Sequence, residues 1–141
     1  MKDFNNSEIL IYQSENGVTK IDVTFMDETV WLSKAQMAEL FQRDRSVISK
    51  YIKKVFEEGE LPRESNVQIL HIANSDKPVE FYNLDVIISV GYRVKSQRGV
   101  QFRIWATNVL KVLKDIMCKV QVQLLNEKTV ETCVLLSNER N

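Results

Sequence analysis

The sequence has few of the residues that build metal sites, phosphate loops and disulfide frameworks. Its 141 residues include two cysteines, one histidine, four glycines and two prolines. Cys118 and Cys133 have no metal-binding spacing, and without a secretory signal they are expected to be reduced thiols. His71 has no neighbouring ligand or nucleophile in the sequence, and the isolated glycines form no phosphate-binding loop. We therefore expect no enzyme activity, no cofactor and no metal.

The chain also lacks a net charge and any long hydrophobic run. Its 19 basic and 19 acidic residues cancel, so no overall positive field indicates nucleic acid. No apolar stretch is long enough to span a membrane, and the polar start MKDFNNSEIL has no signal-peptide core. These features predict a cytoplasmic protein that does not enter the membrane. The length suits one domain, or one domain with a tail.

The basic residues are unevenly distributed along the chain. Residues 43–54 hold five basic residues and one acidic residue, and residues 86–114 hold six basic residues and no acidic one. Because phosphate neutralisation is local, such stretches allow a neutral protein to bind nucleic acid. Solvated helix faces commonly have the same composition. Both interpretations stay open at this level.

The run SKAQMAELFQRDRSVISKYIKKVFEE, residues 33–58, predicts two short helices joined by a tight turn. Ser33 is placed to cap a first helix over residues 34–41, and Asp44 is placed to cap the second. The second helix has one apolar stripe, made by Val47, Ile48, Tyr51, Ile52, Val55 and Phe56. This pattern is typical of a helix-turn-helix, which places its second helix in the DNA major groove.

The opposite face of the second helix provides the candidate DNA-facing edge. Arginine early in such a helix can pair with guanine, and serine and lysine serve phosphates and bases. The candidates are Arg45, Ser46, Ser49, Lys50 and Lys53. Many such motifs place glycine where this chain has Gln42, because the turn needs a positive φ; another residue adopts it at a cost of about 1 kcal/mol. Two amphipathic helices that simply pack in a core are the alternative.

Strands are predicted on both sides of the helix pair. Residues 9–13 and 19–25 form a hairpin around Asn16-Gly17, and residues 29–32 form a short third strand.

A second hairpin is predicted after Gly59 and Pro62 end the second helix, with strands over residues 67–72 and 79–82. A hairpin at this place is typical of a winged helix, with Lys77 at its tip able to touch a phosphate. A plain structural hairpin explains the same pattern.

Two further helices are predicted downstream. Asn83 is placed to cap an apolar core helix from residue 84 to about residue 92. A loop over residues 93–96 leads to a longer helix from residue 97 to about residue 117. Its predicted buried stripe is Phe102, Trp105, Val109, Val112, Leu113 and Ile116. The predicted fold class is α+β: an N-terminal β-hairpin or short sheet, a winged helix-turn-helix-like core and two further helices.

A second basic cluster surrounds the loop before the long helix. It consists of Arg93, Lys95, Arg98 and Arg103. These residues could clamp phosphates where the loop meets a helix N-terminus. They could instead pair with acidic groups of the protein, Glu57 and Glu58 among them. The interleaving with Phe102 and Trp105 favours the structural role.

Three stretches of the chain resemble the RhuM family of bacterial proteins. They are ILIYQSENG, TVWLSKAQMAELFQRDRSVISKYIKKVFEEGEL and FYNLDVIISVGYRVKSQRGVQFRIWATNVLK, and together they cover most of residues 9–114. NLDVIISVGYRVKS followed by FRIWAT is the most specific part. The resemblance implies a DNA-binding-like, regulator-like and virulence-associated protein of bacterial mobile elements, with duplex DNA as partner. A toxin or effector partner is also implied, because similar arrangements precede toxin-like domains in some longer proteins. A homodimer is expected if the DNA target is palindromic. In the alternative, the chain is a protein-interaction module without DNA contact.

The C-terminal stretch departs from that family pattern after Lys114. Residues 119–124 and 129–136 are consistent with strands or with a frayed helical continuation. We expect residues 1–117 to form the RhuM-like winged helix-turn-helix domain and residues 118–141 an atypical tail. A truncated gene or a shifted reading frame would explain the departure.

Overall fold

The computed structural model describes residues 7–71 and 77–124. The expectations for the tip of the second hairpin, for residues 129–136 and for Cys133 lie outside these residues. Contacts within the chain form two compact units, Met1–Ala106 and Thr107–Asn141. All strands and most helices belong to the first unit, whereas the described part of the second unit is helical.

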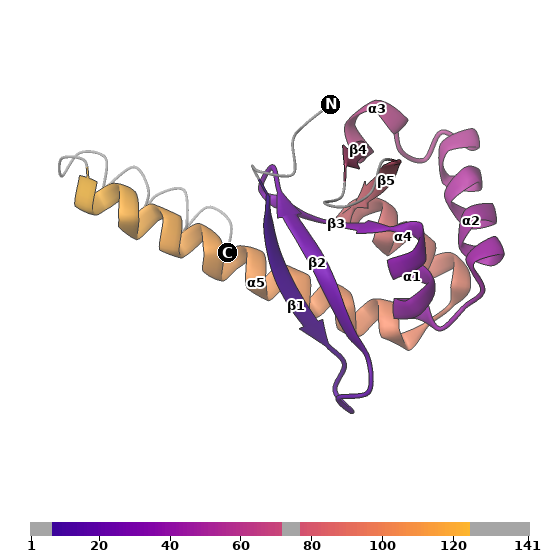
Figure 1. Ribbon diagram of the computed structural model, residues 1–141, viewed down its shortest axis with the longest axis horizontal. Coiled ribbons are helices and arrows are strands. Elements are labelled where there is room, and N and C mark those ends of the chain that lie inside the picture. Colours follow the sequence, from indigo (N-terminus) through magenta and orange to yellow (C-terminus); the bar gives the residue numbers. More distant parts are fainter. Residues whose placement is uncertain (1–6, 72–76, 125–141) are drawn as a thin grey trace. The chain divides into compact units, whose positions relative to one another are not determined.

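The first unit is built on one antiparallel sheet of five strands, in the order β1-β2-β3-β5-β4 (Figure 1). The strands are β1 (Glu8–Gln13), β2 (Lys20–Met26), β3 (Thr29–Ser33), β4 (Val67–His71) and β5 (Pro78–Asn83). Both hairpins and the third strand that the sequence predicts are confirmed. Their union into one sheet was not expected: β3 pairs with β5, with Leu32 opposite Tyr82.

Two tight turns connect the first three strands. Gly17 has a φ of 73° between β1 and β2, as the Asn-Gly signal predicts. Between β2 and β3, Asp27 and Glu28 have φ values of 52° and 64°. Two successive positive φ values are those of a type I′ hairpin turn, whose twist matches that of the flanking strands.

The helices are α1 (Lys34–Phe41), α2 (Arg45–Glu57), α3 (Arg63–Asn66), α4 (Leu84–Val94) and α5 (Gln97–Leu124). Helices α1 and α4 pack on β3 and β5, and α2 packs on both helices (Figure 1). The α+β class is confirmed. The four-residue α3 was not predicted. No helix of the described residues combines the length and apolar character needed to cross a membrane.

Two helix boundaries differ from the predictions. Helix α4 includes Arg93 and Val94, so the loop before α5 is shorter than expected. Helix α5 runs to Leu124 and not to about residue 117, so residues 119–124 follow the helical alternative and not the strand. The alternation in KVQVQL imitates a strand, but no proline or glycine interrupts the helix there. The predicted buried stripe was also wrong at Val112 and Ile116, which are 55% and 50% exposed.

Two glycines bring α4, α5 and α1 together in the core of the first unit. A Cβ at Gly91 would lie 3.4 Å from the ring of Phe41, the last residue of α1. A Cβ at Gly99 would lie 3.1 Å from the same ring and 3.3 Å from the Cα of Gly91. In the sequence these glycines are isolated and form no motif. Their function in the fold is to let α5 approach α4 over Phe41.

Candidate nucleic-acid interface

The start of α1 is fixed by a capping box. Ser33 Oγ accepts a hydrogen bond from the Gln36 amide at 3.2 Å, and Gln36 Oε1 accepts one from the Ser33 amide at 2.9 Å. The side-chain amide of Gln36 also donates to the Asp22 carbonyl at 2.7 Å. The predicted cap at Ser33 is confirmed. Because Asp22 belongs to β2, the cap also fixes α1 to the sheet.

The turn between α1 and α2 forms without glycine. Gln42 has φ 54° and ψ 49°, the left-handed conformation that the sequence analysis required of it. The amide of Arg43 donates to the Ala38 carbonyl at 3.1 Å, and the side-chain amide of Gln42 donates to the Glu39 carbonyl at 2.7 Å. These bonds satisfy carbonyl groups at the end of α1. The prediction of two short helices with a tight turn is confirmed.

Arg43 and Asp44 follow Gln42 and connect the turn to α4 and to the start of α2. Arg43 Nη2 donates to the Val94 carbonyl at 3.4 Å, which connects the turn to the end of α4. This contact of Arg43 was not predicted from the sequence. Asp44 holds the N-cap position of α2, but its carboxylate makes no capping bond to the helix. It accepts instead from the Ser46 hydroxyl, and that hydrogen bond lowers the pKa of Asp44.

Helix α2 has one buried face and one exposed face. Ile48, Ile52 and Val55 are buried, while Val47, Tyr51 and Phe56 are half-buried. The structure brings the five candidates together along the other side. Arg45, Ser46, Lys50 and Lys53 are exposed there, and Ser49 is half-buried between them. The apolar stripe thus holds α2 on the domain and leaves a row of polar and basic side chains on the other side of the helix.

The basic side chains of this row make only weak contacts with other groups of the protein. Lys53 Nζ lies 3.7 Å from a carboxylate oxygen of Glu57, but the two side chains are 75% and 62% exposed. Such exposed pairs contribute little to stability and exchange readily for other counter-charges. Lys50 Nζ lies 5.8 Å from the centre of the Tyr51 ring, and Arg45 forms no ion pair within the described part of the chain.

The second basic cluster has a different environment. Arg93 Nη2 lies 2.5 Å from a carboxylate oxygen of Glu58 and 3.1 Å from one of Glu60. The hydrogen bond from Arg93 lowers the pKa of Glu58. The expected pairing of this cluster with acidic groups of the protein is therefore found at Glu58. Glu60 is a further partner, and Glu57 pairs with Lys53 instead.

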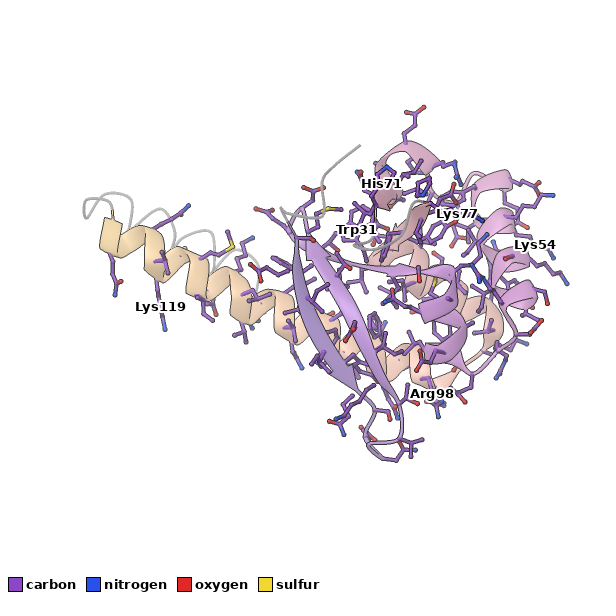
Figure 2. The ribbon with its side chains drawn as sticks, viewed as in Figure 1. Trp31, Lys54, His71, Lys77, Arg98 and Lys119 are labelled. Carbon is purple, nitrogen blue, oxygen red and sulfur yellow. The ribbon has the colours of Figure 1, made fainter. Side chains whose placement is uncertain are left out.

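Arg98 and Arg103 also make contacts within the fold. Arg98 Nη1 donates to Thr19 Oγ1 at 3.1 Å, and Thr19 is buried beside β2. Arg103 Nη1 donates to the Tyr92 hydroxyl at 3.2 Å. In Figure 2, Lys54 marks helix α2 and Arg98 marks the start of α5, the two places where the candidate cations gather. The structure thus assigns Arg98 and Arg103 contacts that hold α5 in place.

Two candidate lysines lie in exposed positions outside α2. Lys95 is the left-handed C-cap of α4, with a φ of 54°. Lys77 directly precedes β5 of the second hairpin. Neither lies on the same helix as the five candidates of α2.

A buried asparagine pair, Asn66 and Asn83, connects the segment after α2 to α4. Only the capping role of Asn83 was predicted from the sequence. Asn83 Oδ1 accepts from the Val86 amide at 3.3 Å, which confirms the predicted cap. Asn83 Nδ2 donates to Asn66 Oδ1 at 2.8 Å, and Asn66 Nδ2 donates to the Pro62 carbonyl at 2.6 Å. No sequence signal marked Asn66 for this contact.

A hollow of about 290 Å³ lies between the end of α4 and the start of α5. Its apolar lining includes Ile88, Tyr92 and Val100, with Lys95 and Arg103 among its polar residues. Tyr92 is 67% exposed, and Ile104 on α5 is 53% exposed. The first unit therefore presents an apolar surface with basic side chains, in addition to the polar row on α2.

Comparison with known proteins gives one family match. Residues 63–131 match the family model described as Virulence protein RhuM family. No match was found among curated proteins or among solved structures. The matched range includes the FYNLDVIISVGYRVKS and FRIWAT segments and continues past Lys114, where the sequence analysis placed a departure. Helices α1 and α2 lie outside this range. The match, over just under half of the chain, supports assignment to the RhuM family.

Proposed function

We propose that this protein binds duplex DNA through the exposed face of α2, as a cytoplasmic, transcription-regulator-like module. The observation that carries the proposal is the row formed by Arg45, Ser46, Ser49, Lys50 and Lys53 opposite the buried stripe of the same helix. A helix held in this way enters the major groove with donors toward base edges and phosphates.

The turn before α2 supports this proposal. Left-handed Gln42 and the contact of Arg43 with the Val94 carbonyl fix α1 and α2 relative to each other and to α4. A fixed recognition helix loses little freedom on binding. Because Arg45 is the first residue of α2, its guanidinium lies at the end of the helix that contacts bases in helix-turn-helix proteins.

The hairpin of β4 and β5 has the chain position of a wing. Lys77 is exposed beside its tip, where a phosphate contact would add affinity without sequence information. Arg93 and Arg98 contribute less to the proposal, because their guanidinium groups already bond Glu58 and Thr19. We propose a binding role and no catalytic one.

The experiment that tests this proposal is selection of bound duplexes from a random pool, using the full chain. We expect an enriched sequence motif with the wild type and loss of enrichment with Arg45→Ala. Lys50→Ala and Lys53→Ala should weaken the retention of all duplexes. A palindromic motif would indicate a homodimer. A pool that shows no enrichment and no retention at low salt contradicts DNA binding.

A second candidate function is protein interaction, for example with a toxin or effector partner. The observation that favours it is the exposed apolar surface that Tyr92 and Ile104 provide on α4 and α5, and not on α2. Exposed apolar surface next to a hollow is a common property of interaction sites. The two functions use different surfaces, so each can be removed by substitutions that leave the other intact.

A further inference from the structure

The hollow between α4 and α5 is shaped by the close approach of these helices. Gly91 and Gly99 bring the helices together over Phe41, and both glycines also line the hollow. Ile88 and Val100 face it from the two helices, and Tyr92 lines it as well. Its volume of about 290 Å³ is at the lower end for small-molecule sites and suits one large apolar side chain.

Basic groups line the same hollow, and no acidic residue lines it. Lys95 follows α4 and is exposed, and Arg103 extends from α5 to donate to the Tyr92 hydroxyl at 3.2 Å. Residues 86–114 contain six basic residues and no acidic one, so nothing on these two helix segments neutralises the site. An apolar hollow beside two cations is complementary to an apolar side chain flanked by carboxylates.

We propose that this hollow docks an acidic segment of a partner protein, with one large apolar side chain inserted between α4 and α5. The proposal rests on the second candidate function and names the chemistry of the partner. The inserted side chain contacts Ile88 and Val100, while flanking carboxylates pair with Lys95 and Arg103. Exposed Tyr92 and Ile104 extend the apolar surface beyond the hollow, as a peptide ligand requires and a small ligand does not.

The test uses the full chain and four labelled hexapeptides. Each has one central apolar residue, leucine, isoleucine, phenylalanine or tryptophan, followed by alanine, with two glutamates on each side. Matched peptides carry glutamine in place of every glutamate. Binding is measured by fluorescence anisotropy, and the site is mapped by amide chemical-shift changes.

We expect at least one acidic peptide to bind and to shift amides of α4 and the start of α5. Its glutamine counterpart should bind roughly fivefold more weakly or worse, and Lys95→Gln with Arg103→Gln should weaken the acidic peptide similarly. Lys50→Gln with Lys53→Gln changes the net charge equally and should leave peptide affinity unchanged. Thermal melts confirm that both double variants fold.

Three results would overturn the proposal: no binding by any acidic peptide, equal binding of the glutamine peptides, or shifts confined to α2. Duplex DNA binding, measured in parallel, separates the two functions. If DNA binds and the peptides do not, only the docking proposal fails. If the peptides bind at the hollow and DNA does not bind, the DNA proposal fails and the docking proposal stands.

Discussion

The guanidinium of Arg93 on α4 lies 2.5 Å from a carboxylate oxygen of Glu58, the C-cap of α2. The same guanidinium lies 3.1 Å from a carboxylate oxygen of Glu60. The Arg93 side chain is 23% exposed, so this ion pair is more sheltered from solvent than the Lys53–Glu57 pair. One residue of the basic cluster thereby holds the end of α2 against α4, and the charge of its guanidinium is already compensated.

Arg93→Ala is expected to lower thermal stability while leaving DNA affinity close to that of the wild type. The substitution removes both carboxylate contacts at the end of α2 but does not touch the exposed row. Melting curves followed by circular dichroism and a duplex titration below the melting transition measure the two effects. A large loss of DNA affinity at unchanged stability would show instead that Arg93 contacts DNA.

The Arg93 contact also predicts a pH dependence. Its hydrogen bond lowers the pKa of Glu58 below the ordinary value of 4.5 in the folded state. A lowered pKa stabilises the fold above the unfolded value, and this contribution is lost as the pH falls through the folded value. The stability difference between wild type and Arg93→Ala should therefore be constant near neutral pH and shrink below about pH 4.5. Urea unfolding at several pH values would show it; a difference that grows on acidification would refute it.

Gln42→Gly is expected to stabilise the protein by about 0.5 to 1 kcal/mol. Glycine removes the strain of the left-handed conformation at φ 54°, although the side-chain bond to Glu39 is lost. Gln42→Val should destabilise it, because a β-branched residue fits a positive φ poorly. Urea unfolding of the three proteins checks the order. If Gln42→Val has the same free energy of unfolding as Gln42→Gly, the left-handed conformation at this position is not strained.

Gly99→Ala is expected to destabilise the fold by about 1 to 3 kcal/mol, because a Cβ there meets Phe41 at 3.1 Å. Gly91→Ala should cost less, since its new Cβ would lie 3.4 Å from the same ring. In a Phe41→Leu background the cost of Gly99→Ala should fall by about 1 kcal/mol, which a double-mutant cycle measures. Strict additivity of the two substitutions would show that the ring is not the obstacle.

Local signals in the sequence predicted much of the first unit. Ser33 and Asn83 cap the helices that their types and positions indicated, and Asn16-Gly17 forms the expected hairpin turn. These features depend on neighbours within a few residues. The pairing of β3 with β5 depends on segments about 50 residues apart, and no local pattern specifies it.

The candidate site was predictable to a similar extent. Periodicity alone placed the five candidates on the exposed side of α2. The partners of Arg93 depend on tertiary packing. The sequence offered Glu57 and Glu58 as candidates; Glu58 is a partner, Glu57 is not, and Glu60 was missed. The packing of Gly91 and Gly99 against Phe41 has no local sequence signal either. A glycine shows a close approach only when the residue that packs against it is known.

The salt dependence of duplex DNA binding tests the central proposal most directly. Wild-type affinity should fall steeply as salt rises, because each phosphate contact releases counterions. Lys50→Ala and Lys53→Ala should each weaken binding and reduce the slope of log affinity against log salt by about one. Lys20→Ala, an exposed lysine on β2, is the matched control and should change neither. Absence of duplex binding at low salt, or slopes unchanged in the α2 variants, would contradict DNA binding through this helix.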